Sequence, residues 1–193
     1  MMTAAERWVR TVEDARVFVR SAGLCLIFKA GPGSRYPALW DVVDAPDSQP
    51  GEGGHGPRDM LVWRLKNELP TCYPDEVFYG KLSGGRAMLC TLERLADLYR
   101  AQHREAGALS RDAQRLLALI AGRPISNKDL RLDSGFHTPD TRARFERALQ
   151  ELQVSFQIAR VDVEPDTWFP FAAVYPGIAG SFTPAPAARS RRP

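Results

Sequence analysis

The sequence lacks the features that mark membrane and secreted proteins. Its uninterrupted apolar runs, such as Leu24–Phe28, are far shorter than the roughly 20 residues of a membrane helix. Near the first residues no hydrophobic segment of a secretory signal is visible. The three cysteines have neither the spacing of a zinc site nor that of a redox pair, which excludes a disulfide scaffold. These absences predict a cytoplasmic protein with reduced thiols and no membrane contact.

Motifs of the common enzyme classes are missing as well. There is no P-loop, no G-x-G-x-x-G, and no Ser-His-Asp or Cys-His pattern, and the three histidines stand far from one another. We therefore expect no metal and no cofactor. Glu68, Asp75 and Glu76 are candidate general acids or bases. Because no pattern around them indicates burial, we predict no catalytic residue.

The charge of the chain is nearly balanced. The composition, 44% hydrophobic and 25% charged, is that of a soluble globular protein. Over residues 1–175 basic and acidic residues are equal in number, so the net charge of +3 comes from Arg189, Arg191 and Arg192. Counterion release from phosphates supplies most non-specific affinity for DNA. Contact with nucleic acid must therefore rest on a local basic face.

The first half of the chain predicts helices, strands and one long loop. Thr11 and Gly23 are typical caps of a helix over residues 12–22. The apolar run that follows fits a buried strand or a short buried helix. Residues 44–59, rich in glycine and proline, predict a flexible loop.

Residues 60–103 predict a helix, a hairpin and another helix. The helix over residues 60–69 is expected to end before Pro70. Strands at 78–82 and 87–90 flank a glycine turn, and Thr91 caps the next helix. This order fits a winged-helix-like unit and fits a generic α+β domain equally well. We expect the aromatic residues of this half to lie in the core: Trp40, Trp63, Phe78 and Tyr79.

The pattern is clearest in the second half. Helices begin at Ser110, Ser126 and Thr138, and extended segments follow at residues 154–163 and 168–175. Three helices closed by a hairpin is the winged helix-turn-helix order. The sequence thus predicts a helix-rich α+β fold of tandem winged-helix-like units. The expected parts are a domain at residues 1–109, a domain at residues 110–175 and a disordered tail at residues 176–193.

The third helix of the second half is a candidate recognition helix. Phe145, Ala148, Leu149 and Leu152 form its apolar face, which leaves Arg142, Arg144, Arg147 and Gln150 on the other side. Arginine and glutamine suit phosphates and base edges in a major groove, although a solvated helix would show the same residues. The remaining predicted DNA contacts lie elsewhere along the chain: Lys128, Arg131, Arg64, Lys66, Lys81 and Arg86.

Several segments together resemble a known family. They are G-L-C-L-I-F (23–28), P-A-L-W (37–40), W-R-L-K-N-E-L-P (63–70), Y-G-K-L (79–82) and R-F-E-R-A-L-Q-E-L-Q (144–153). The sequence resembles the AlkZ-related winged-helix proteins over residues 12–175. These are relatives of the AlkZ/YcaQ DNA glycosylases, which consist of tandem winged helices and remove alkylated or crosslinked bases. The resemblance implies double-stranded DNA as the partner and a role in DNA repair or damage response.

One feature of the glycosylases is absent at the matching place. They carry Gln-x-Gln or Gln-x-Asp a fixed distance before a Leu-Trp pair, and those polar groups position a water molecule. Counting back from Leu39-Trp40 leads to Leu24 and Leu26, which cannot hold water. The resemblance therefore implies a DNA-binding protein without this chemistry. Two alternatives are a diverged glycosylase that uses Glu68 or a neighbouring acid, and a winged-helix module that binds a protein partner.

Overall fold

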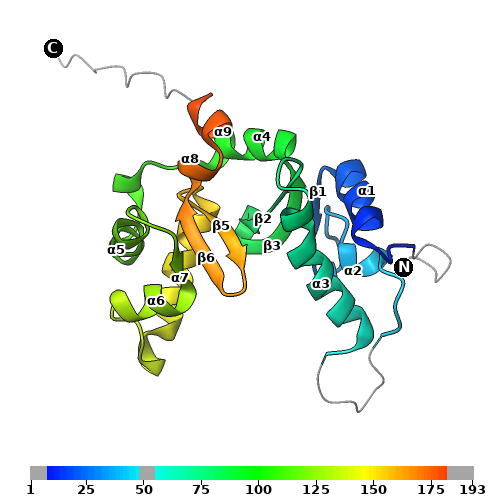
Figure 1. The fold of residues 1–193 in the computed structure, drawn as a ribbon, viewed down its shortest axis with the longest axis horizontal. Helices are drawn as coiled ribbons and strands as arrows, with labels where there is room; N and C mark the ends of the chain where they lie inside the picture. The colour runs from blue at the N-terminus through cyan, green and yellow to red at the C-terminus, as the bar shows by residue number, and fades with distance from the viewer. Residues whose placement is uncertain (1–7, 48–54, 182–193) are drawn as a thin grey trace.

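The structure, a computed structural model, describes residues 8–47 and 55–181, in which two halves repeat one order of elements (Figure 1). The first half contains α1 (Val12–Ala22), β1 (Leu24–Leu26), α2 (Leu39–Val42), α3 (Pro57–Cys72), β2 (Val77–Leu82) and β3 (Arg86–Thr91). The second half contains α5 (Arg111–Ile120), β4 (Ile125–Ser126), α6 (Asn127–Asp133), α7 (Arg142–Val154), β5 (Ile158–Val163) and β6 (Asp166–Pro170). Helix α4 (Leu92–Gln102) joins the halves, and α8 (Phe171–Val174) and α9 (Pro176–Gly180) follow.

The two sheets also share one strand order. In the first half the order is β1-β3-β2, and in the second it is β4-β6-β5, with antiparallel pairing throughout. Helices and antiparallel sheets thus combine into an α+β fold, which confirms the predicted fold class. Within residues 8–47 and 55–181, no helix combines the length and the apolar composition needed to cross a bilayer.

Capping side chains mark the starts of four helices. The Thr11 side chain accepts a hydrogen bond from the backbone N–H of Asp14, and the Asp14 carboxylate accepts one from the backbone N–H of Thr11. The side chains of Thr91, Ser110 and Ser126 cap α4, α5 and α6 in the predicted way. These helix starts are therefore confirmed.

In the first half, the predicted start and end of α3 are wrong, and in the second half so is the start of α7. Residues 57–59 of the predicted loop form the first turn of α3, because proline suits the first helical position, while residues 48–54 lie outside the described residues. Pro70 stands inside α3, so close to its end that the lost backbone hydrogen bond does not stop it. Before α7, residues 139–141 form a separate 3₁₀ turn.

The C-terminal predictions also need correction. The second extended segment ends at Pro170, and residues 171–174 form α8, because Phe171 turns into the core instead of continuing the hairpin. The expected tail forms α9 over residues 176–180, where Ile178 and Ala179 pack against buried side chains. Apolar contacts with residues distant in sequence thus stabilise a helix in a segment whose local composition predicts none.

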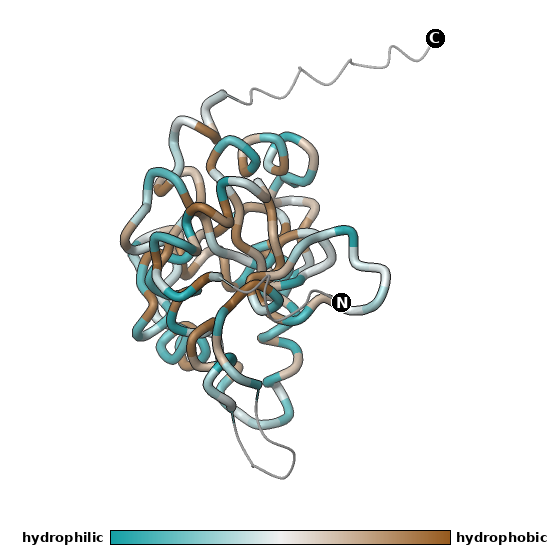
Figure 2. The backbone as a smooth tube through the Cα atoms, turned by 90° about the vertical axis from the view of Figure 1, so that its right-hand side faces the viewer, coloured by the Kyte–Doolittle hydropathy of each residue, from teal (hydrophilic) through white to brown (hydrophobic). Residues whose placement is uncertain are grey.

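A shared aromatic cluster joins the two halves. Phe171 stacks on Tyr99 of α4, with ring centroids 5.2 Å apart, and meets Phe156 edge-on at 5.4 Å. Phe78 of β2 belongs to the same core. Two further core clusters lie within single halves, and Figure 2 shows the hydrophobic segments gathered in the interior. The halves therefore share one buried cluster, while each half also has a core of its own.

A second contact places the turn of the first sheet on α7. The backbone N–H of Lys81 donates to Gln153 Oε1 at 3.2 Å. Gly85, in the β2–β3 turn, lies so close to Gln150 that a Cβ there would overlap its amide group. The C-terminal half of α7 is thus covered by the first half of the chain.

Candidate nucleic-acid interface

Cations from both halves meet at one tyrosine. The Arg160 guanidinium of β5 lies over the Tyr79 ring of β2, 4.0 Å from its centroid. Lys66 Nζ of α3 lies 5.0 Å from the same centroid. We call Lys66, Tyr79, Arg160 and Asp166 the junction site; Figure 1 shows α3 and the β5–β6 hairpin on opposite sides of β2 and β3. The fold thus brings together residues distant in sequence.

The junction site holds more buried positive than negative charge. Lys66 is 5% exposed, and burial together with the nearby Arg160 lowers its pKa to about 8. The Arg160 side chain is 4% exposed, and its Nη1 donates to Asp166 Oδ1 at 3.0 Å. Its Nη2 is buried without a hydrogen-bond partner. Two cations facing one carboxylate favour an incoming anion.

Lys81 extends the basic surface along the sheet. Side chains alternate along a strand, so Lys81 shares the sheet face of Tyr79. In the described part of the chain, Lys81 forms no ion pair. Beside these residues lies a cavity of about 310 Å³ whose wall includes Thr71, Tyr79 and Arg160. Of the charged residues in this wall, Arg160 is basic and Asp162 is acidic.

The predicted recognition helix α7 presents less free charge than its sequence suggests. Arg144 donates two hydrogen bonds to Asp112 of α5, at 3.0 and 2.7 Å. Gln150 faces the β2–β3 turn. Arg142 and Arg147 are exposed, and Lys128 and Arg131 line a cavity of about 500 Å³ between α6 and α7. Glu146 lines the same cavity and offsets part of its positive charge.

The remaining predicted contacts lie in the first half. Arg64 is exposed on α3, 3.8 Å from Glu68. Arg86 lies at the β2–β3 turn, 5.3 Å from the ring centroid of Tyr36. A hydrogen bond with Ser83, aided by the charges of Arg35 and Arg86, lowers the pKa of Tyr36. The turn next to α7 is therefore locally positive.

The structure corrects one expectation about aromatic residues. Phe78 is buried and Trp40 and Tyr79 are partly buried, but Trp63 is 51% exposed. Among the described residues, Phe28 and Lys66 lie beside its ring. The sequence reasoning also missed Arg160. One feature of the sequence could have pointed to it, because Arg160 is the sole basic residue between residues 153 and 175.

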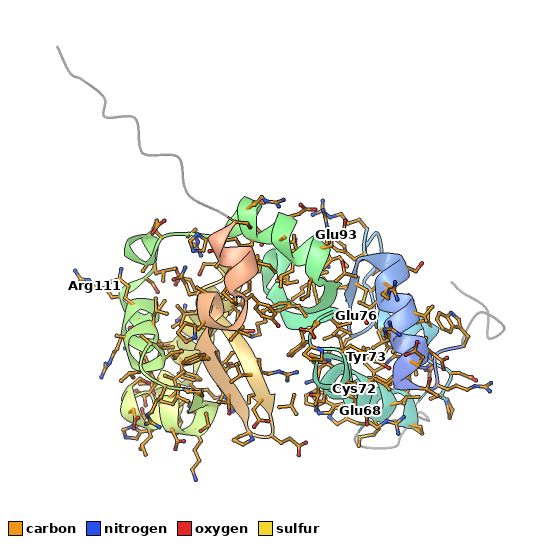
Figure 3. All side chains as sticks on the ribbon, turned by 45° about the horizontal axis from the view of Figure 1, so that its top comes forward. Glu68, Cys72, Tyr73, Glu76, Glu93 and Arg111 are labelled. Atoms are coloured by element: carbon orange, nitrogen blue, oxygen red, sulfur yellow. The ribbon has the colours of Figure 1, made fainter. Side chains whose placement is uncertain are left out.

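The acidic candidates do not form a catalytic pair. Glu76 accepts two hydrogen bonds from Arg16, at 2.8 and 2.9 Å, which lower its pKa and keep it ionised. Glu68 is on the exposed side of α3; Figure 3 shows both carboxylates in the first half, with Arg111 at the opposite end. Among the described residues, no group of histidine, cysteine, aspartate or glutamate has the arrangement of a metal site.

The comparisons with known proteins identify a family. Residues 9–167 match the family described as AlkZ related. No curated protein and no solved structure matches the chain. Because the match extends over most of the sequence, the chain belongs to the AlkZ-related family.

Proposed function

We propose that the protein binds double-stranded DNA along the groove between α3 and the β5–β6 hairpin. The observation that carries the proposal is the junction site, where cations of both halves surround Tyr79 and one buried guanidinium nitrogen lacks a partner. Membership in a family related to AlkZ-type DNA glycosylases supports DNA as the anion. The hairpin also carries acids, Asp162 in the cavity wall and Glu164 at its tip, so we assign the phosphate contacts to the cations Lys66, Lys81 and Arg160.

The repeated topology supports reading each half as a winged-helix unit. In each half the order is helix, strand, two helices and a hairpin, and the last strand lies in the middle of the sheet. Helices α3 and α7 hold the third position, which reads DNA in helix-turn-helix proteins. Because the first half covers part of α7, we assign the DNA contact to α3.

Matched charge reversals test the assignment. The buried stripes of the two helices correspond, so Arg64 of α3 takes the place of Arg147 in α7. We expect Arg64→Glu to weaken duplex binding about tenfold, since it replaces a phosphate partner by a repelling charge, and Arg147→Glu to have an effect below about twofold. Fluorescence anisotropy with a labelled duplex measures both. The reverse ranking would assign DNA to the face of Arg142, Arg147, Lys128 and Arg131.

A salt titration separates DNA binding from protein binding. Each phosphate contact contributes a slope of about −0.9 to the plot of log affinity against log salt. We expect a slope between about −3 and −5 for the native chain, because few cations line the groove. Negligible affinity even at low salt would favour the alternative, a module that binds a protein partner.

We further propose that binding occurs without base excision. Leu24 and Leu26, at the positions of the water-positioning residues of the glycosylases, are buried in β1 and belong to the shared core. A base-release assay on alkylated DNA is expected to show no product. Release that is lost in Glu68→Gln would establish the diverged glycosylase instead. In the absence of release, a repair or damage-response role rests on DNA recognition alone.

A further inference from the structure

An apolar hollow with aromatic walls lies on the outer side of α3. Met60 and Trp63 of α3 are 58% and 51% exposed, and Phe28, which follows β1, is 39% exposed. The rings of Phe28 and Trp63 are 6.0 Å apart between centroids and tilted by 39°. These side chains, with His55 and Asp59, line a cavity of about 410 Å³. Large apolar side chains grouped in this way mark a binding surface.

Positive charge flanks the aromatic walls. Lys66 Nζ lies 4.1 Å from the centroid of Trp63 and connects the hollow to the junction site. Lys29, beside Phe28 in the chain, and Arg64, beside Trp63, are both exposed. Among the described residues, the wall has one carboxylate, Asp59, which already accepts hydrogen bonds from Trp40 Nε1 and from the backbone of Gly56. Cations around aromatic rings match a nucleotide, which has an anionic backbone and a flat base.

We propose that this hollow receives a single unpaired base of the bound DNA, which stacks on Trp63. The inference rests on the proposed function and names the structure in DNA that the protein selects. With the backbone of the strand along the junction site, an unpaired base would find the exposed indole one helical turn away on α3. A paired base stays in its stack and gains nothing from the hollow, whereas an unpaired base has lost stacking that Trp63 restores.

The test compares two labelled duplexes of one sequence, fully paired or with one extra unpaired adenine. We expect the native chain to bind the bulged duplex about tenfold more tightly, because stacking on an aromatic side chain contributes about that factor per base. Trp63→Ala should abolish the preference and leave the affinity for the paired duplex nearly unchanged. Trp63→Phe should keep part of it. Trp8→Ala is the matched control, since Trp8 is also exposed, at 43%, but lies outside the hollow.

Each other outcome overturns the inference. If the native chain bound both duplexes equally, the hollow would not receive an unpaired base, but the proposal that the protein binds DNA would stand. A Trp63→Ala variant that loses affinity equally for both duplexes would make Trp63 a general contact. A change in the sedimentation of the DNA-free variant would show that the hollow joins two copies of the chain. Failure to bind either duplex would refute the proposed function together with this inference.

Discussion

The two halves share one topology but use the same helix position differently. Helix α7 buries Phe145, Ala148, Leu149 and Leu152, and lies partly beneath the β2–β3 turn, where Gln153 is also buried. Helix α3 buries the corresponding stripe but exposes its other side, including Trp63 and Arg64. A repeated fold therefore does not imply a repeated function. When one unit packs on the third helix of the other, only one such helix remains open to a ligand.

The difference extends to the buried stripe itself. Where α7 has Leu149, α3 has Lys66. A buried lysine costs free energy of folding that leucine does not. Sites at which a sequence departs from the apolar rule are those where function is expected. The comparison thus points to α3 independently of its exposed side.

The largest expected effect tests whether the halves fold as one unit. Phe171→Ala removes the ring that contacts Phe78, Tyr99 and Phe156, and should lower the free energy of unfolding by about 3–5 kcal/mol. We expect a single transition, because the lost contacts belong to both halves. Urea unfolding followed by tryptophan fluorescence and by circular dichroism measures it. Phe145→Ala, in the core of the second half alone, is the control.

Two separate transitions in the native chain would contradict this expectation. They would show that the shared cluster contributes little, and that the halves behave as the independent domains that the sequence predicts.

A smaller effect is expected at the contact between the β2–β3 turn and α7. Gly84 and Gly85 both have positive φ, +73° and +76°, but only Gly85 faces Gln150. Replacement by alanine costs about 1–2 kcal/mol at either site for the left-handed backbone. We expect Gly85→Ala to cost about 1 kcal/mol more than Gly84→Ala. Thermal unfolding of the two variants gives the difference.

A double variant sharpens this result. Gln150→Ala should remove the excess cost of Gly85→Ala, since the overlapping amide is gone. An unchanged cost in the double variant would mean that the turn does not rest on α7. The conclusion that the first half covers α7 would then be wrong.

The smallest expected effect depends on pH and distinguishes Lys66 from Leu149. The pKa of Lys66 is about 8 in the folded chain, below its usual value of 10.5. Between these values the unfolded chain binds more protons, so the free energy of unfolding should rise with pH. Lys66→Met should flatten this rise and add about 1–2 kcal/mol at pH 7. Leu149→Met should leave the pH dependence as it is.

Chemical denaturation at pH 7, 8 and 9.5 measures this effect. A native chain whose stability is flat over this interval would show that Lys66 keeps its ordinary pKa, and that burial of its charge costs little.

Local signals predicted most of the fold. Thr11, Thr91, Ser110 and Ser126 each cap a helix where the sequence places one, because a capping side chain bonds to backbone only three residues away. The stripe from Phe145 to Leu152 is buried as its spacing predicts. Helix capping and the burial of a helical stripe both depend on residues within one or two turns, and these residues can be read directly from the sequence.

The candidate site was predicted only in part, because it forms at long range. Lys66 was among the expected contacts, but its partner Arg160 is near the other end of the chain, and nothing around residue 160 indicates a tyrosine from β2. Trp63 has the spacing of a core residue, and only the packing of α3 shows that the described residues leave it half exposed. Arg144 is neutralised by Asp112, a contact between two helices that neither helix reveals.

The aromatic cluster around Phe171 has a mechanical consequence for any ligand. Because buried ring contacts oppose a change of angle between the two halves, we expect the proposed groove to keep nearly the same width when a duplex binds. A duplex bound there would then have to bend or open to fit. Selection would then follow the stiffness of each duplex, since pliable or weakened sites deform at lower cost than intact ones.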